Sequence, residues 1–278
     1  MLFSYHITKT YYFWFTLIIV FMRKSNFIFL LFSKVLAFKL RLILRIRYRI
    51  KLKGAEVINK NATILYLPNH QALIDPIILF SEIYRFSTAT PVISEKYYDI
   101  PVARWLFSKM GAVRVSDLEA GSRDTQVLKS ITRSVFKGLR RNTNIVIYPS
   151  GQIAAQGFEK IFNKKAAYHI VNDLPENVLI AGVRISGLWG SRFSKFKTGK
   201  SPNFIVQLLQ GGLFALANLF VLMPKRNVLI EFEDITAGAR KIAADGQKPL
   251  NTYLEEFYNL HGEQTAARPK YFFFLPGH

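Results

Sequence analysis

A histidine and an aspartate lie five residues apart in this chain, at the junction between a strand-like run and a helix-like run. His70 follows the short apolar run 62–67, which is typical of a buried strand. Asp75 precedes Pro76, and because a residue before proline avoids helical torsions, we expect Asp75 to be the N-cap of the next helix. A turn that ends in such a cap folds the imidazole back onto the carboxylate. The pair then predicts a positioned general base, with one ring nitrogen held and the other free to accept a proton.

Other catalytic chemistries find less support in the sequence. A histidine near an aspartate is often structural, and this interpretation stays open for His70. Ser150 and Ser191 are candidates for an acylated nucleophile, but Pro-Ser-Gly at 149–151 differs from the Gly-x-Ser-x-Gly elbow, which favours ordinary turn serines. The chain has no cysteine, so thiol catalysis is excluded. No Walker-type or dinucleotide-binding glycine motif occurs. No metal site is predicted, because the remaining histidines are scattered: His6, His169, His261 and His278.

Short apolar runs alternate with segments of helical spacing along most of the chain. The predicted strands cover residues 62–67, 91–94, 111–115, 144–148, 178–183 and 228–232, and the predicted helices cover 76–84 and 121–141. This alternation predicts an α/β domain with a mostly parallel central sheet flanked by helices. Ligands of such sheets collect beyond the carboxyl ends of the strands. Both the His70 turn and the turn at 149–151 follow predicted strands, so we expect them to meet.

The ends of the chain have a different composition from its middle. The net charge is +20, from 38 Lys and Arg against 18 Asp and Glu, and no acidic residue precedes Glu56. Apolar blocks at 11–22 and 27–32 are separated by Arg23 and Lys24 and are shorter than the roughly 20 residues of a bilayer span. They favour helices that lie in the membrane interface, with a true span and a core helix as alternatives. We therefore predict an N-terminal basic, aromatic, membrane-associating segment (1–44), a central domain (45–236) and a C-terminal tail (237–278).

The strong positive charge implies an anionic partner, either nucleic acid or an anionic membrane surface. The basic residues interleave with long aliphatic residues instead of an aromatic stacking platform, which disfavours nucleic acid. Residues 45–53 alternate basic and apolar side chains and predict a strand that is protected by charge at a sheet edge or faces lipid phosphates. The uncharged run 201–224 contains Asn, Gln and Gly residues that oppose insertion, so we expect a buried or membrane-apposed segment there.

Residues 69–76 (Asn-His-Gln-Ala-Leu-Ile-Asp-Pro) resemble the His-x-x-x-x-Asp signature of the glycerolipid acyltransferases, which include the lysophosphatidate acyltransferases. Residues 148–152 fall where that family has Phe-Pro-Glu-Gly-Thr-Arg. Residues 180–187 resemble its later Val-Pro-Val-like strand, and 47–54 its lead-in strand. The branch that resembles this chain most is found in bifunctional acyl-acyl-carrier-protein synthetase/2-acylglycerophosphoethanolamine acyltransferases. There a glycine and a Lys-Ile pair likewise follow the Pro-x-Gly turn, here Gly157 and Lys160-Ile161.

The resemblance implies a glycerol-3-phosphate acyltransferase-like fold and a membrane-associated enzyme of phospholipid biosynthesis on the cytoplasmic face of the inner or cell membrane. The enzyme would transfer a fatty acyl group from acyl carrier protein or coenzyme A to the glycerol hydroxyl of a lysophospholipid. It would need no cofactor beyond this co-substrate and form no acyl-enzyme. His70 would be the base and Asp75 its orienting partner, with an acyl-chain groove lined from residues 201–224. The implied substrate-binding residues are Asn69, Ser150, Gly151, Gln152, Arg114 and Arg123.

Four positions depart from the family pattern. Ser150 replaces the motif glutamate, and Gln152-Ile153 replaces the threonine-arginine pair. The second motif commonly has an arginine six residues after its glycine, but Asp117 stands at that distance from Gly111. Arg114 or Arg123 is then expected to bind phosphate instead. These departures support an alternative hypothesis, a catalytically weak or inactive lipid-binding protein on the same scaffold.

Overall fold

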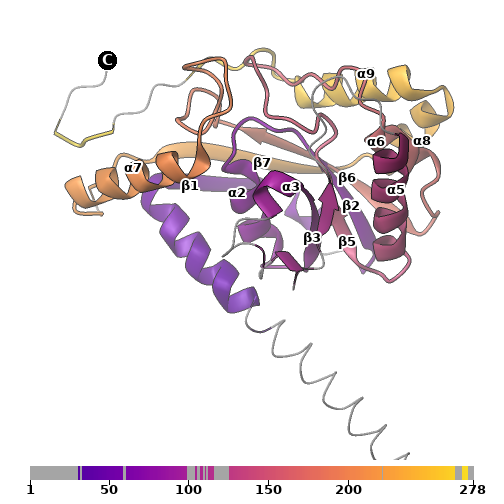
Figure 1. Cartoon of the computed structure of the whole chain (residues 1–278), viewed down its shortest axis with the longest axis horizontal. Helices are drawn as coiled ribbons and strands as arrows, with labels where there is room; N and C mark the ends of the chain where they lie inside the picture. Colours follow the sequence, from indigo (N-terminus) through magenta and orange to yellow (C-terminus); the bar gives the residue numbers. More distant parts are fainter. Residues whose placement is uncertain are drawn as a thin grey trace, which may run out of the picture.

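The computed structural model describes residues 31, 33–58, 61–98, 104, 107, 108, 110, 112–115, 125–220, 222–266 and 271–274. Its strands form one seven-stranded sheet in the order β1-β7-β6-β2-β5-β3-β4 (Figure 1). All neighbouring pairs are parallel except β6 and β7, which are antiparallel. The predicted mostly parallel α/β sheet is therefore confirmed. The strands are β1 Tyr48–Lys53, β2 Thr63–Pro68, β3 Ala89–Ser94, β4 Val113–Val115, β5 Asn144–Val146, β6 Val178–Ser186 and β7 Arg226–Asp234.

Helices cover both faces of the sheet (Figure 1). One face packs against α2, and the other packs against α5, α6, α8 and α9. The helices are α2 Asp75–Ile83, α3 Glu95–Tyr98, α5 Thr125–Leu139, α6 Ala166–Asn172, α7 Phe204–Ala217, α8 Thr236–Ala244 and α9 Gln247–Tyr258, with a 3₁₀ turn, η1, at Ala55–Val57. Residues 33–47 are also helical.

The central strand β2 is buried along its whole length. Its side chains alternate between the two layers: Ile64 and Tyr66 join the core beneath α2, and Leu65 and Leu67 join the core beneath α5, α6, α8 and α9. A strand covered on both faces reads as a continuous apolar run, which is why residues 62–67 predicted it correctly. This burial fixes the point from which the His70 turn leaves the sheet.

The predicted strand at 45–53 begins three residues later than expected. Residues 45–47 are helical, and β1 starts at Tyr48. Leu40, Leu44 and Tyr48 are four residues apart and pack on the same core cluster, so helical spacing persists up to the strand. From Tyr48 the predicted alternation is confirmed, because the basic residues of β1 are exposed. The strand lies at the sheet edge beside β7.

The C-terminal segment contains two helices that the sequence analysis did not predict. Leu250, Leu254 and Tyr258 of α9 are buried in the core, and so is Ala239 of α8. The hydroxyl of Tyr258 donates a hydrogen bond of 2.9 Å to the carbonyl oxygen of Leu67, close to the His70 turn. Residues 237–258, which were assigned to a tail, thus pack on the same sheet as the central domain.

The uncharged run 201–224 contains α7, none of whose residues is buried. The prediction of a buried segment is therefore wrong, since the helix packs through a few side chains and leaves most of its apolar residues exposed. Membrane apposition stays a prediction. Among the described residues, no helix has the length and apolar character that a membrane crossing requires. The apolar block at 11–22 lies outside the described residues, and so does the block at 27–32 except for Leu31.

Candidate active site

The turn between β2 and α2 brings His70 and Asp75 together. The Nδ1 atom of His70 lies 3.2 Å from Oδ2 of Asp75. Asp75 is the first residue of α2, and Ile74 occupies the N-cap position of this helix. The predicted capping role of Asp75 is therefore wrong. The same Oδ2 accepts hydrogen bonds from the backbone N–H groups of Gln71 and Ala72. The carboxylate therefore points back into the turn and ties it to the imidazole.

The two side chains of this pair differ in exposure. The side chain of Asp75 is fully buried, whereas that of His70 keeps 14% of its area exposed. Burial raises the pKa of Asp75 above its ordinary value, and the His70 ring and the amides of Ala72 and Gln71 act in the opposite direction. Within the described residues the Nε2 atom of His70 has no hydrogen-bond partner, so it is available to a substrate.

The residues on either side of His70 clamp the turn to β6 and to the loop just after it. The amide of Asn69 donates to the carbonyl of Ile185 at 2.9 Å and accepts from the N–H of Ile185 at 2.7 Å. The side chain of Gln71 accepts from the N–H of Leu188 at 3.0 Å. Asn69 is also buried. We therefore interpret Asn69 as a structural clamp and not as the predicted substrate contact.

The loop after β5 packs directly against the imidazole. The ring of Tyr148 lies 4.4 Å from that of His70, centroid to centroid, and the N–H of Ala154 donates to the His70 carbonyl at 2.6 Å. Gly151 has a φ of +62°, a left-handed conformation that favours glycine. Of the three predicted substrate-binding residues in this loop, Gly151 and Gln152 are exposed, but Ser150 is buried. Ser150 thus presents almost no surface to solvent, and its predicted substrate contact stays a prediction.

Glu159 is a residue of this site that the sequence analysis missed. Its carboxyl Oε2 accepts a hydrogen bond of 3.0 Å from the backbone N–H of His70, and the nearby Ser150 hydroxyl, like this N–H, acts to lower the pKa of the carboxyl group. Burial raises the pKa of Glu159 from an ordinary 4.5 to about 8, against the opposing effects of these two groups. The only sequence signal nearby was the resemblance at Gly157 and Lys160-Ile161, which concerned no carboxylate.

The C-terminal helix α9 holds Glu159 in place. The side chain of Asn259, which follows α9, accepts from the Glu159 N–H at 2.8 Å and donates to the Glu159 carbonyl at 3.0 Å. Glu255 of α9 accepts from the N–H of Ile161 at 2.7 Å, and its other oxygen pairs with Lys160 at 3.1 Å. The loop that carries Glu159 is therefore fixed by a segment about 100 residues further along the chain.

Of the two predicted phosphate-binding arginines, the structure describes only Arg114, which is not brought to His70. Arg114 lies on the edge strand β4, and its guanidinium pairs with Glu95 and sits 5.7 Å from the ring centroid of Tyr98. Because β5 and β3 separate β4 from β2, Arg114 is roughly three strand spacings, about 14 Å, from the strand that carries His70. Arg123 lies outside the described residues, as do Gly111 and Asp117.

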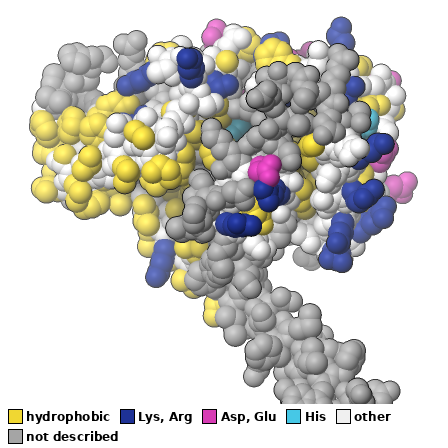
Figure 2. Space-filling view, viewed as in Figure 1, with side chains coloured by type: hydrophobic (Ala, Val, Ile, Leu, Met, Phe, Trp, Pro, Cys, Tyr) yellow, Lys and Arg dark blue, Asp and Glu magenta, His cyan; other side chains and the backbone are white. Residues whose placement is uncertain are grey.

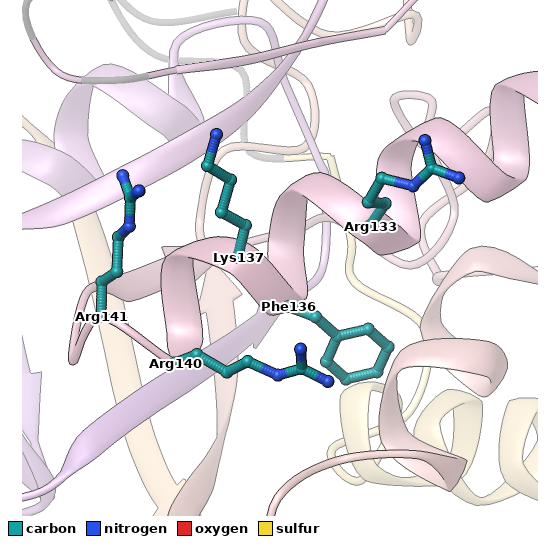
Figure 3. Close-up of a pocket in the computed structure, with 5 residues that line it drawn as sticks. All are labelled: Arg133, Phe136, Lys137, Arg140 and Arg141. Carbon is teal, nitrogen blue, oxygen red and sulfur yellow. The ribbon is translucent and has the colours of Figure 1, made fainter.

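Two cavities in the described part of the chain do not include His70. The larger, with a volume of about 540 Å³, lies on α5. Figure 3 shows Arg133, Lys137 and Arg141 projecting to one side of this helix, and Phe136 and Arg140 to the other. This end of α5 leads into the start of β5. Because β5 is parallel to β2, the cavity lies near the amino ends of the strands, whereas His70 follows the carboxyl end of β2. The smaller cavity, of about 20 Å³, lies along residues 152–162. Neither cavity is lined by residues 201–224, where the acyl-chain groove was predicted.

The fold and the site together define a class of protein. A mostly parallel sheet presents a histidine-aspartate pair at the carboxyl end of its central strand, beside a Pro-Ser-Gly turn, as in the acyltransferase resemblance. The Acyltransferase family model matches residues 49–186, from β1 to the end of β6. The chain therefore belongs to the Acyltransferase family, which confirms the predicted membership. The particular branch stays a prediction.

Further comparisons give a distant likeness. The crystal structure of the 1-acyl-sn-glycerophosphate (LPA) acyltransferase, PlsC, from Thermotoga maritima is similar at 17% sequence identity, with a TM-score of 0.48. The likeness covers 80% of this chain and 77% of that chain. No curated protein matches the sequence.

Two buried tyrosine hydroxyls of this site should differ in their effect on stability. Within the described residues the hydroxyl of Tyr148 is buried without a hydrogen-bond partner, whereas that of Tyr258 donates to Leu67. We expect Tyr148→Phe to leave the free energy of unfolding unchanged or to raise it by up to about 1 kcal/mol. Tyr258→Phe should lower it by about 1–2 kcal/mol, because the Leu67 carbonyl loses its donor. Urea unfolding of both variants tests this, and equal losses would contradict it.

Proposed function

We propose that this protein is a membrane-associated O-acyltransferase. It transfers a fatty acyl group from the thioester of acyl carrier protein or coenzyme A to the glycerol hydroxyl of a lysophospholipid. The observation that supports this proposal most is the geometry of the dyad: Asp75 holds Nδ1 of His70 at 3.2 Å, and the other ring nitrogen has no partner among the described residues. Family membership supports acyl transfer as the reaction class.

The dyad can carry both proton transfers of this reaction. Nε2 of His70 accepts the proton of the acceptor hydroxyl as the hydroxyl oxygen attacks the thioester carbonyl carbon. The tetrahedral intermediate collapses, the carbon–sulfur bond breaks, and the leaving thiolate takes the proton from the imidazolium. The products are an ester and a free thiol, with no acyl-enzyme. The buried carboxylate of Asp75 stabilises the imidazolium between the two steps and keeps the ring in the orientation that exposes Nε2.

The acceptor would bind beside the loop after β5. Gly151 and Gln152 are exposed there, next to Tyr148, whose ring contacts His70. Backbone and amide groups at this position suit the phosphate of a lysophospholipid. Arg114 is paired with Glu95 at the far sheet edge and does not serve this purpose. Phosphate recognition in this chain would thus depend on the Gly151–Gln152 turn more than on a predicted arginine.

Membrane association is supported by the surface around α7. Hydrophobic side chains gather over this helix in Figure 2, and the helix itself contains no charged residue. We call this the α7 surface; its exposed residues are Ile205, Val206, Leu208, Leu209, Leu213 and Leu216. Exposure of a contiguous apolar surface to water is energetically unfavourable, and such a surface marks an interaction site. A bilayer provides the apolar cover.

A second apolar surface lies on the 33–47 helix. It exposes Val35, Phe38 and Ile43 and interleaves them with basic residues. Arg47 at its end donates to the carbonyl of Pro224 and lies 5.6 Å from the ring centroid of Tyr271, which stacks on Phe214 of α7. The two helices are thereby linked. Each basic residue near an anionic leaflet adds about 1 kcal/mol to binding, which favours the predicted cytoplasmic face.

Replacement of the base should abolish the proposed reaction. We expect His70→Ala to lower the rate of acyl transfer to lysophospholipid vesicles by about 10²–10⁴-fold, since the substitution removes the proposed general base. His169→Ala on α6 is the matched control and should keep the wild-type rate. Thioester consumption and ester formation are measured by mass spectrometry. Full turnover by His70→Ala would contradict the mechanism, and a wild-type protein that binds vesicles without turnover would favour the lipid-binding alternative.

The membrane proposal makes a separate prediction for two equally exposed leucines. Leu213 of α7 and Leu260 after α9 are each 65% exposed. Leu213→Asp should weaken binding to anionic vesicles at least tenfold, because a buried leucine contributes about 1.5–3 kcal/mol. Leu260→Asp should bind as the wild type does. Vesicle co-sedimentation measures both, and equal affinities would show that α7 does not contact the bilayer.

A further inference from the structure

The ring of Tyr271 contacts three cationic side chains that come from two distant segments of the chain. The guanidinium groups of Arg47 and Arg192 are 5.6 Å and 5.4 Å from its centroid, and the ammonium group of Lys197 is 5.6 Å away. Arg47 ends the 33–47 helix, whereas Arg192 and Lys197 belong to the loop between β6 and α7. We call the ring and these three side chains the Tyr271 cluster. The ring attracts each cation, but the cations repel one another.

Among the described residues, no acidic side chain is ion-paired with either of the two loop cations, Arg192 and Lys197. The sequence contains no Asp or Glu at all from residue 177 to residue 230. Arg192 is held by neutral groups instead: its Nε donates to the side-chain oxygen of Gln207 at 3.0 Å, and another guanidinium nitrogen donates to that of Gln210. The charge of the two loop cations is therefore available to an anion from outside the chain.

A fully buried asparagine fixes the ring beside α7. Nδ2 of Asn218, just after α7, donates to the carbonyl of Tyr271 at 2.8 Å, and Oδ1 accepts from the N–H of Phe273 at 2.9 Å. The Tyr271 ring stacks on Phe214 of α7, with 5.2 Å between the centroids and 27° between the ring planes. The guanidinium of Arg192 lies over the same Phe214 ring at 4.6 Å. The cluster is thus assembled before any ligand arrives, which lowers the entropy cost of binding.

The cluster borders the apolar α7 surface. Phe214 belongs to α7, and Phe273 and Phe274, which follow Tyr271, are 50% and 59% exposed. Lys197 is exposed in the loop that leads into α7. In a bilayer the phosphate groups lie just outside the hydrocarbon, where aromatic rings gather and lysine side chains extend their charge. An apolar helix with aromatic rings and cations at its border is therefore suited to bind a lipid phosphate.

We propose that the Tyr271 cluster binds the phosphate group of an anionic lipid in the bilayer that the α7 surface contacts. The exposed ammonium group of Lys197 makes the direct contact, and the half-buried guanidinium groups of Arg47 and Arg192 add their charge. This inference rests on the proposed membrane association, and it gives the cluster no part in the chemistry of acyl transfer.

The bound lipid would also set the position of the active site relative to the bilayer. The loop that carries Arg192 is bonded to the β2–α2 turn, because the N–H of Leu73 donates to the carbonyl of Phe193 at 3.0 Å. A phosphate held by this loop would therefore keep the His70 turn at a fixed place above the lipid headgroups.

Binding to phosphatidylcholine vesicles with and without phosphatidylglycerol tests this site. Lys197→Gln should lose about fivefold in affinity for the vesicles that contain phosphatidylglycerol, and Arg192→Gln at least as much, because each removes a cation beside the phosphate. Lys197→Arg keeps the charge and should stay within about twofold of the wild type. Lys200→Gln is the matched control, an exposed lysine of the same loop, and should bind as the wild type does. Equal losses in Lys197→Gln and Lys200→Gln would indicate diffuse attraction and overturn the inference.

A soluble lipid keeps this inference separate from the proposed function. The ring signals of Tyr271 in protein labelled on tyrosine are assigned by comparison with Tyr271→Phe and followed by NMR during titration with monomeric dihexanoylphosphatidylglycerol. The signals should shift and saturate in the wild type, and Lys197→Gln should need about fivefold more lipid, whether or not the protein transfers acyl groups. A response to inorganic phosphate but not to the lipid would overturn the lipid assignment. If no ring signal responds, the inference fails, and a loss of vesicle binding in Leu213→Asp would still support membrane association.

Discussion

The site depends on one buried oxygen, Oδ2 of Asp75, which accepts from the His70 ring and from two backbone N–H groups of the same turn. A carboxylate without solvent is tolerated only where donors surround it. The five-residue separation lets Oδ2 meet this demand by pointing back, toward the turn that precedes its own helix, while Oδ1 is buried without a hydrogen-bond partner among the described residues. This requirement sets the start of α2 at Asp75 and the orientation of His70. The clamps from Asn69 to β6 and from Gln71 to the loop after β6 then hold the whole turn at the carboxyl end of β2.

A second layer of positioning comes from parts of the chain that lie beyond the matched acyltransferase segment. The family match ends at residue 186, yet β7, α8 and α9 complete the sheet and its cover. Asn259 and Glu255 fix the backbone of the loop that carries Glu159, and Tyr258 bonds to the strand just before His70. Gly157 belongs to the same arrangement, because a Cβ there would lie 2.5 Å from the carbonyl oxygen of Gln264. The C-terminal helices are thus part of the active-site scaffold.

The sequence predicts the sheet and the proximity of His70 and Asp75 well because both are local signals. Buried strands such as 62–67 read as apolar runs, and His70 and Asp75 are only five residues apart. The features that were missed are non-local. Asp75 was expected to cap its helix because it precedes a proline. Local torsional preferences do not reveal the N–H donors of the turn, which draw the carboxylate away from the helix. Asn69 was expected to bind substrate. Its hydrogen-bond partner, Ile185, lies 116 residues away, so the clamp between them is not visible in the local sequence. Glu159 carries no motif of its own, and only the fold brings its carboxyl group to His70.

The central claim is that Asp75 fixes the protonation of His70, with the proton on Nδ1 and Nε2 left as an acceptor. The ¹⁵N chemical shifts of the His70 ring in the substrate-free protein at pH 8 test this claim directly. We predict a protonated Nδ1 and an unprotonated Nε2 in the wild type, and a mixture of both tautomers in Asp75→Asn. A wild-type ring that carries its proton on Nε2, or a ring unaffected by Asp75→Asn, would contradict the account.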